Sequence, residues 1–255
     1  MFLNAEMQLI YRVANAPILM FPYPHILVHD VFPDDFYREI RKHLPPNKAY
    51  KSLKDMGRVG SAYPDERVVL PLTPTEVAAL DEPYRSFWDQ TARWLLGGAF
   101  GSILLQKFSP LLQHRFDNLS NMQFDYEALV IQDRTNYKLG PHTDMPAKVL
   151  SLLFYLPADD SMPHLGTSMY LPTDPTFTCD GSTHYDFKGF QRLLTMPYVR
   201  NTLFAFMKTP NAFHGVEPVT EPGVERALLL YDIKTAKTTT APLPARPAAS
   251  TTFSF

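Results

Sequence analysis

Hydrophobic and polar positions are distributed differently in the two halves of this chain, and the second half has the clearer pattern. From about residue 124, short apolar runs typical of β-strands follow one another. These runs read FDYEALVIQ, KVLSLLFYL, TSMYLP, NTLFAFM, FHGVEPV and RALLLYDI. Their spacing is too tight for crossover helices, so the pattern favours antiparallel strands in a barrel or a sandwich.

The first half of the chain carries helix signals instead. The segment 33–44, PDDFYREIRKHL, opens with proline and two aspartates and ends with basic residues, as helix termini prefer. The segment 73–98 begins with Thr-Pro-Thr-Glu and ends on two glycines, and we expect Pro83 to divide it into two helices. The predicted fold is therefore α+β and mainly β: a sandwich-like barrel with N-terminal helices packed on one sheet.

The distribution of proline and the absence of an internal repeat indicate one domain. Most of the 24 prolines stand between apolar runs, which suits a fold of many short strands and turns. We expect a single domain over 1–234, with a helical support region at about 1–120 and a barrel core at about 120–234. The last segment, 235–255, is rich in Thr, Ala and Pro, and its composition predicts an extended or disordered tail.

Composition and charge narrow the classes of function. The chain has 255 residues, 45% of them hydrophobic and 20% charged, which is ordinary for a globular protein. A formal net charge of −2 argues against broad electrostatic binding to nucleic acid. No run approaches the roughly 20 apolar residues of a membrane helix, and the single cysteine, Cys179, fits a reducing compartment. We therefore expect a cytoplasmic protein that binds neither nucleic acid nor membranes.

Candidate metal ligands lie in the stretch YKLGPHTDMPAKVLSLLFYL, just before an apolar run. His142 and Asp144 are two positions apart, so on a strand both side chains would point to the same face and reach one ion. The chain has a second pair of this kind, His184 and Asp186. A barrel must fit several strands between such a pair and a third ligand, for which His214 is the best candidate because apolar runs flank it. Seventy residues separate Asp144 from His214, but only 28 separate Asp186 from it, so the first pair is favoured.

Two histidines and one carboxylate form the facial triad of non-haem iron oxygenases, in which three coordination positions stay open. The stretches HTD, HGVEPV and ERALLLYDI together resemble the 2-oxoglutarate/Fe(II)-dependent oxygenase superfamily, and most closely its prolyl-hydroxylase-like branch. The resemblance covers roughly residues 120–235 and implies a double-stranded β-helix, which is a jelly-roll-like barrel. It also implies that Fe(II) binds His142, Asp144 and His214, with 2-oxoglutarate as cosubstrate and O2 as oxidant.

By the same resemblance, the distal carboxylate of 2-oxoglutarate would pair with Arg226 and accept hydrogen bonds from Tyr155 and Ser151. Arg226 stands twelve positions after His214, where the branch has about ten, and the loop TEPGVE accommodates the excess. A bidentate contact with a carboxylate is the physical reason for an arginine there. The implied activity is that of an oxygenase, in particular a hydroxylase, which releases succinate and CO2.

Two other classes of protein stay open at this point. One is a related barrel enzyme that binds a metal without using 2-oxoglutarate, and the other is a non-catalytic binding module on the same fold. No motif specifies the substrate, which is either a small molecule or a protein side chain.

The long segment 157–200 is polar and rich in turn residues, so we expect it to be mostly loop and to border the substrate entrance in part. His184, Tyr185 and Asp186 would then contact the substrate, although a plain surface loop is the equal alternative. The remaining histidines are interpreted as surface or internally hydrogen-bonded residues: His25, His29, His43, His114 and His164.

Overall fold

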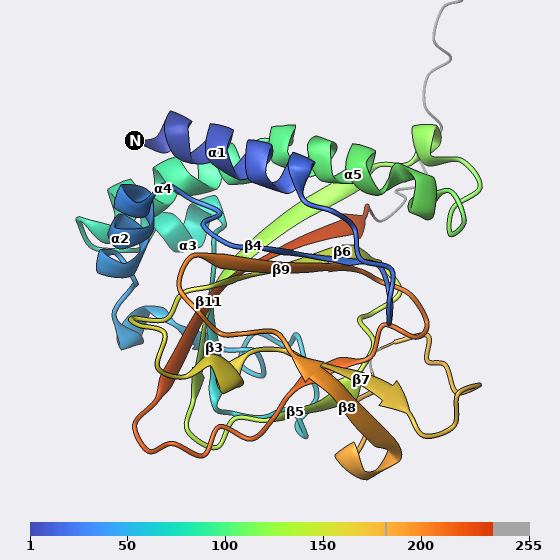
Figure 1. The fold of residues 1–255 in the computed structure, drawn as a ribbon. Coiled ribbons are helices and arrows are strands. Elements are labelled where there is room, and N and C mark those ends of the chain that lie inside the picture. The colour runs from blue at the N-terminus through green and yellow to red at the C-terminus, as the bar shows by residue number, and fades with distance from the viewer. Residues whose placement is uncertain (182, 237–255) are drawn as a thin grey trace, which may run out of the picture.

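The computed structural model describes residues 1–181 and 183–236, and its strands form two antiparallel sheets. The strands are β1 (His25–Val28), β2 (Lys51–Ser52), β3 (Arg67–Pro71), β4 (Phe124–Arg134), β5 (Leu139–His142), β6 (Lys148–Tyr155), β7 (Ser168–Pro172), β8 (Phe190–Thr195), β9 (Thr202–Met207), β10 (His214–Val216) and β11 (Glu225–Thr235). The larger sheet has the order β1-β9-β6-β11-β4-β3-β2, and the smaller sheet, which faces it, has the order β5-β10-β7-β8 (Figure 1). A mixed fold of helices and antiparallel sheets is thus confirmed.

Five helices belong to the first half of the chain. They are α1 (Phe2–Asn15), α2 (Asp34–Lys42), α3 (Pro74–Ala78), α4 (Tyr84–Leu95) and α5 (Ala99–Leu112). The helix predicted at 33–44 is α2, and the predicted division at Pro83 separates α3 from α4. Thr73 caps α3 by accepting a hydrogen bond from the Glu76 backbone N–H at 3.3 Å. The sequence pattern singled out neither α1 nor α5.

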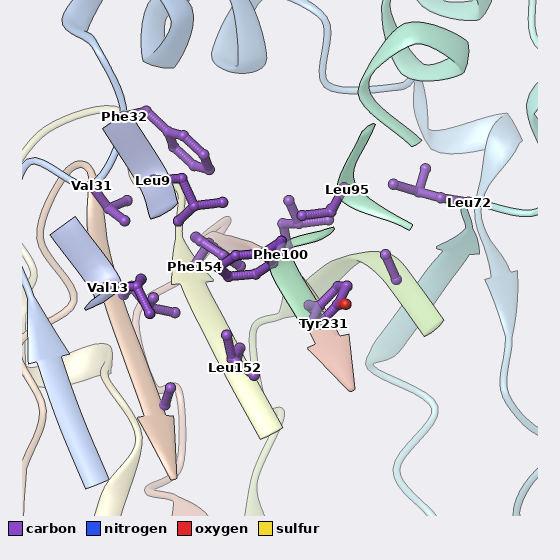
Figure 2. Packing of buried hydrophobic residues seen from close by; sticks show 14 of the residues in the cluster. Leu9, Val13, Val31, Phe32, Leu72, Leu95, Phe100, Leu152, Phe154 and Tyr231 are labelled. Carbon is purple, nitrogen blue, oxygen red and sulfur yellow. The ribbon is translucent and has the colours of Figure 1, made fainter. Parts of the chain in front are cut away.

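The helices and the outward face of the larger sheet share one buried apolar cluster. Leu9 and Val13 of α1 and Phe100 of α5 belong to it together with Leu152 and Phe154 of β6 (Figure 2). These side chains are at most 1% exposed. Burial of so many large apolar groups, each contributing about 1.5–3 kcal/mol, gives this face most of its stability.

The stretch Tyr84–Leu112 is long and apolar enough, by length and composition, to cross a membrane. It consists of α4 and α5, which are separated at Gly98, where a φ of +92° ends any continuous helix. Phe87, Leu104 and Phe108 in this stretch are buried in the same apolar cluster as the sheet. The buried side of these two helices therefore belongs to the core of the protein.

A second buried cluster fills the space between the two sheets. It brings Tyr155, Phe204 and Phe206 of the larger sheet together with Met169 and Val216 of the smaller one. Because alternate residues of a strand point to opposite faces, β6 and β9 contribute to both clusters and read as continuous apolar runs. The candidate ligands line a cavity together with Phe206 and Val216 of this cluster.

All six apolar runs predicted as strands are strands, namely β4, β6, β7, β9, β10 and β11. The segment 157–200 is less irregular than expected, because Phe190–Thr195 forms β8 beside β7. The side chains of β8 are exposed or half-buried, so the strand has no apolar run to reveal it. In the predicted tail, Thr235 is still the last residue of β11, and residues 237–255 lie outside the described part of the chain.

Candidate metal centre

The structure brings His142, Asp144 and His214 together, although they come from separate elements. One ligand atom of each lies within 4.8 Å of the others, and all three residues are 7–8% exposed. His142 ends β5, His214 begins β10, and the two residues are direct partners in the antiparallel register. Asp144 lies beyond the end of β5. The expectation that both members of the pair share one strand is therefore wrong, and the turn after His142 brings the carboxylate to the site.

The two imidazoles are held in an orientation that suits metal binding. Nδ1 of His142 lies 3.0 Å from the Gly140 carbonyl, and Nδ1 of His214 lies 3.0 Å from the Ala212 carbonyl. A carbonyl only accepts, so each Nδ1 donates its proton and each Nε2 keeps a lone pair for an ion. Burial lowers the pKa of both histidines below 6.5, which keeps them neutral and able to bind a metal at pH 7.

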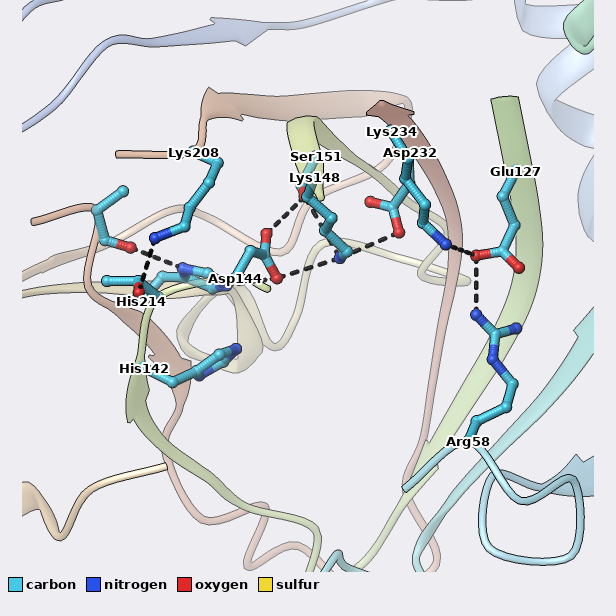
Figure 3. Close-up of polar contacts among 12 residues, drawn as sticks. Arg58, Glu127, His142, Asp144, Lys148, Ser151, Lys208, His214, Asp232 and Lys234 are labelled. Atoms are coloured by element: carbon cyan, nitrogen blue, oxygen red, sulfur yellow. Dashed lines mark hydrogen bonds and ion pairs between the residues drawn. The ribbon is translucent and has the colours of Figure 1, made fainter. Parts of the chain in front are cut away.

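The Asp144 carboxylate is fixed by two neighbours on β6. The Ser151 hydroxyl donates to Oδ2 at 2.6 Å, and the Lys148 ammonium lies 3.1 Å from Oδ1 (Figure 3). Lys148 also lies 3.0 Å from Asp232 of β11, so one cation bridges two buried carboxylates. Burial alone would raise the pKa of Asp144, but Lys148 and the histidines lower it. The carboxylate is therefore ionised, as a metal ligand must be.

Cys179 and Tyr185 pack closely against the turn that carries the candidate ligands. The Thr143 hydroxyl donates to the Cys179 carbonyl at 2.9 Å, and the Tyr185 N–H donates to the Pro141 carbonyl at 2.9 Å. A Cβ on Gly140 would meet the Tyr185 carbonyl oxygen at 2.1 Å, so only glycine permits this approach. Part of the segment 157–200 thus packs against the turn that carries the ligands, and its place at the substrate entrance stays a prediction.

The second histidine–aspartate pair takes no part in the cluster of three ligands. The His184 ring packs edge-on against the His142 ring, with 4.5 Å between centroids, and also against the Tyr63 ring. Asp186 instead caps a short 3-10 turn by accepting from the Lys188 N–H at 2.8 Å. His184 is therefore placed beside the metal ligands, whereas Asp186 stabilises the chain locally.

Four of the other histidines have hydrogen-bond partners, as the sequence predicted. Their ring nitrogens lie 2.6–3.0 Å from polar groups of neighbouring residues. The four are His25, His29, His43 and His164. Their rings are thus occupied by local contacts, away from the cluster of three ligands.

The three residues assigned to 2-oxoglutarate lie in different environments. Arg226 and Ser151 line the same cavity as the metal ligands, but Ser151 donates to Asp144. Arg226 is 1% exposed, and its guanidinium lies 5.8 Å from the Tyr155 ring. The Tyr155 hydroxyl accepts from the Thr167 N–H at 3.0 Å. A cation and a cavity that also contains the metal ligands fit a cosubstrate that carries a distal carboxylate.

Three charged residues beside the site went unnoticed in the sequence. Lys148 contacts the candidate metal ligand Asp144, and Arg67 lines the cavity. Asp133 pairs with Arg226 at 2.6 Å. Burial alone would lower the pKa of Arg67, but the Asp133 carboxylate outweighs it and raises that pKa well above its usual value. The available signal was a charged residue next to a buried apolar run, because such a charge needs a partner.

Comparison with known proteins agrees with this fold. No protein-family model matches the chain, and no curated protein matches it significantly. Among solved structures, a Pseudomonas putida prolyl-4-hydroxylase superposes with a TM-score of 0.52 and 13% identity, over 90% of this chain and 98% of that one. A Burkholderia pseudomallei oxidoreductase of the 2OG-Fe(II) oxygenase family has a TM-score of 0.46 and 12% identity, over 82% and 84% of the two chains. The carbocyclase SnoK from nogalamycin biosynthesis has a TM-score of 0.48 and 11% identity, over 91% and 85%.

At such low identity, the likeness to the prolyl-4-hydroxylase shows a shared fold. This likeness confirms, at the level of the fold, the resemblance stated from HTD, HGVEPV and ERALLLYDI. What this chain does with the fold depends on its own side chains.

Proposed function

We propose that this protein is an oxygenase dependent on Fe(II) and 2-oxoglutarate, and that it hydroxylates its substrate. The observation that carries the proposal is that one cavity is lined by three buried metal-ligating side chains and by the buried Arg226. Two neutral imidazoles and a carboxylate are the donor set of non-haem Fe(II) oxygenases. When bound, iron and cosubstrate supply an oxidation by O2 that is coupled to decarboxylation of 2-oxoglutarate to succinate.

This chain would prepare the site in three ways. The backbone carbonyls behind His142 and His214 fix the ring orientations. Ser151 and Lys148 hold the Asp144 carboxylate, so it does not have to reorganise when a metal binds. Arg226 would bind the distal carboxylate of the cosubstrate, and the aromatic residues of the inner cluster, such as Phe206, would exclude water.

We extend the proposal to the fold and the location of the protein. The two facing sheets would be the two halves of a double-stranded β-helix, with the N-terminal helices supporting the larger one. The substrate would be a small molecule or a protein side chain, and the protein would act in the cytoplasm without binding nucleic acid or membranes. These last points depend on the composition and charge of the sequence.

A second candidate function has a specific observation in its favour. The guanidinium of Arg226 is already paired with the Asp133 carboxylate at 2.6 Å. An arginine whose charge is fully satisfied would not attract a second carboxylate, and the protein would then be a metal-dependent enzyme that does without 2-oxoglutarate. The dependence of activity on 2-oxoglutarate separates the two functions.

The proposal is tested with the anaerobic protein in the presence of Fe(II) and 2-oxoglutarate. A weak visible charge-transfer band is expected, as the chelated cosubstrate gives in the enzymes that this chain resembles. His142→Ala and Asp144→Ala should abolish the band, and the matched control His184→Ala should retain it. If the wild-type protein develops no band and forms no succinate when air is admitted, the proposed function is refuted.

A further inference from the structure

Arg67, Asp133 and Arg226 form a row across three neighbouring strands of the larger sheet. In the antiparallel register, Asp133 of β4 is the direct partner of Arg67 on β3 and of Arg226 on β11. Direct cross-strand partners have their side chains on the same face of a sheet, about 5 Å apart. Both arginines line the cavity that contains the metal ligands, so this face is the inner one.

The Asp133 carboxylate is shared between the two arginines. It is completely buried, and it accepts from Arg67 Nε at 2.6 Å, from Arg67 Nη2 at 2.8 Å and from Arg226 Nη1 at 2.6 Å. Arg67 thus makes the bidentate contact, and Arg226 makes a single contact. Two guanidinium groups and one carboxylate leave the row with a net charge of +1.

This net charge determines whether Arg226 can attract an anion although it is paired with Asp133. Arg226 and Asp133 alone would be neutral. The attraction of a neutral buried pair is too weak to offset the free-energy cost of desolvating another carboxylate. Arg67 balances the charge of Asp133 and leaves one positive charge in the row. The other contacts of Arg226, to the Leu165 carbonyl and to the Thr167 hydroxyl at 3.4 Å, are with neutral groups and consume no charge.

We propose that Arg67 is a positioning residue for the cosubstrate, which balances the charge of Asp133 so that Arg226 keeps a positive charge for a distal carboxylate. This inference rests on the proposed function and deepens it. It assigns the ligand to the 2-oxo acids that carry a second carboxylate. Selectivity for this second carboxylate would then depend on Arg67, Asp133 and Arg226 together. The apparent conflict between the Arg226–Asp133 pair and cosubstrate binding then disappears.

The test is a comparison of two ligands by calorimetry, with Mn(II) as a redox-inactive metal. The probes are 2-oxoglutarate and 2-oxopentanoate, which have the same chain length and differ in the distal carboxylate. The ratio of their affinities isolates the contribution of that carboxylate from chelation at the metal. The wild-type protein should prefer 2-oxoglutarate strongly.

Charge balance predicts a specific order among the variants. Arg67→Met makes the row neutral and should lower the preference for 2-oxoglutarate by about 10- to 100-fold, with 2-oxopentanoate binding unchanged. Arg67→Met combined with Asp133→Asn restores the charge of +1 and should recover most of the preference. Arg226→Met should lose the preference, because Arg226 is the residue proposed to contact the distal carboxylate. A merely structural role for Arg67 predicts that the double variant is worse than either single variant.

Three results would overturn the inference. One is an unchanged preference in Arg67→Met, and another is a lost preference that Asp133→Asn does not recover. The third is an equal loss of preference in Arg67→Lys and Arg67→Met, which applies even if the double variant does not fold. Arg67→Lys keeps the charge, so charge balance predicts that its preference stays within a few-fold of wild type. A wild-type protein that binds neither ligand would instead refute the proposed function itself.

Discussion

Lys148 is the side chain whose removal best tests the polar network behind the metal ligands. Its ammonium lies 3.1 Å from Asp144 and 3.0 Å from Asp232, and the three side chains are 16%, 9% and 2% exposed. The substitution Lys148→Met keeps an apolar stem of similar length and removes only the cation. Two buried carboxylates then face one another with nothing between them, and one Asp232 oxygen already has no partner among the described residues.

The expected cost follows from the burial of these groups. Removing one partner of a buried ion pair costs about 3–5 kcal/mol, and the partial exposure of Lys148 favours the lower end, about 3 kcal/mol. In a protein of this size, each kcal/mol lowers the melting temperature by about 2–4 °C. The metal-free variant should therefore melt about 6–12 °C below the wild type.

Thermal unfolding in EDTA and in Mn(II) measures this effect and its cause. A divalent cation beside Asp144 replaces part of the missing charge, so Mn(II) should stabilise Lys148→Met more than it stabilises the wild type. The control is Lys48→Met, which breaks an ion pair with Asp81 that is 74% and 69% exposed and should melt close to the wild type. If metal-free Lys148→Met melts as high as this control, the network does not stabilise the protein as argued.

Three further predictions concern the same site. Burial lowers the pKa of His142 and His214 below 6.5. The stability that these two neutral imidazoles contribute is therefore fully present above that pH, and it is lost as the pH falls toward their lowered pKa values. The metal-free protein should melt at a lower temperature at pH 5.5 than at pH 7.5, and replacing both histidines with Asn should flatten this dependence. Gly140→Ala should lower Mn(II) affinity in calorimetry, because a Cβ would clash with the Tyr185 carbonyl; unchanged affinity would contradict this. Ser151→Ala should lower that affinity about 10- to 100-fold, and an effect below threefold would mean that the hydroxyl does not position the carboxylate ligand.

The strands that the sequence predicted are mostly those with an unbroken apolar run. β6 and β9 pack against the helices on one face and against the smaller sheet on the other, so nearly every residue is apolar. β5 has the sequence LGPH, which reads as a turn, and it is a strand because β10 pairs with it. Its assignment depends on tertiary pairing, which a local pattern does not contain.

The cluster of His142, Asp144 and His214 was accessible to sequence reasoning because the pair is local and its spacing to His214 favours it over the other pair. Asp144 nevertheless lies after β5 and not on it, so the strand geometry expected for the pair was wrong. The contact of Ser151 with this carboxylate could not be predicted from the sequence either. Ser151 is seven residues from Asp144, and the turn between them decides that the two side chains meet.

The row of Arg67, Asp133 and Arg226 shows what limits such reasoning. The three residues are 66 and 93 positions apart in sequence, and no motif connects them. The sequence permits a solvated charge at the start of β11, yet Arg226 is 1% exposed. Only the register of β4 against β3 and β11 puts Asp133 between the two arginines, and a shift of one residue would turn it to the opposite face. A buried charge in a strand therefore predicts that a partner exists, whereas the identity of the partner requires the register.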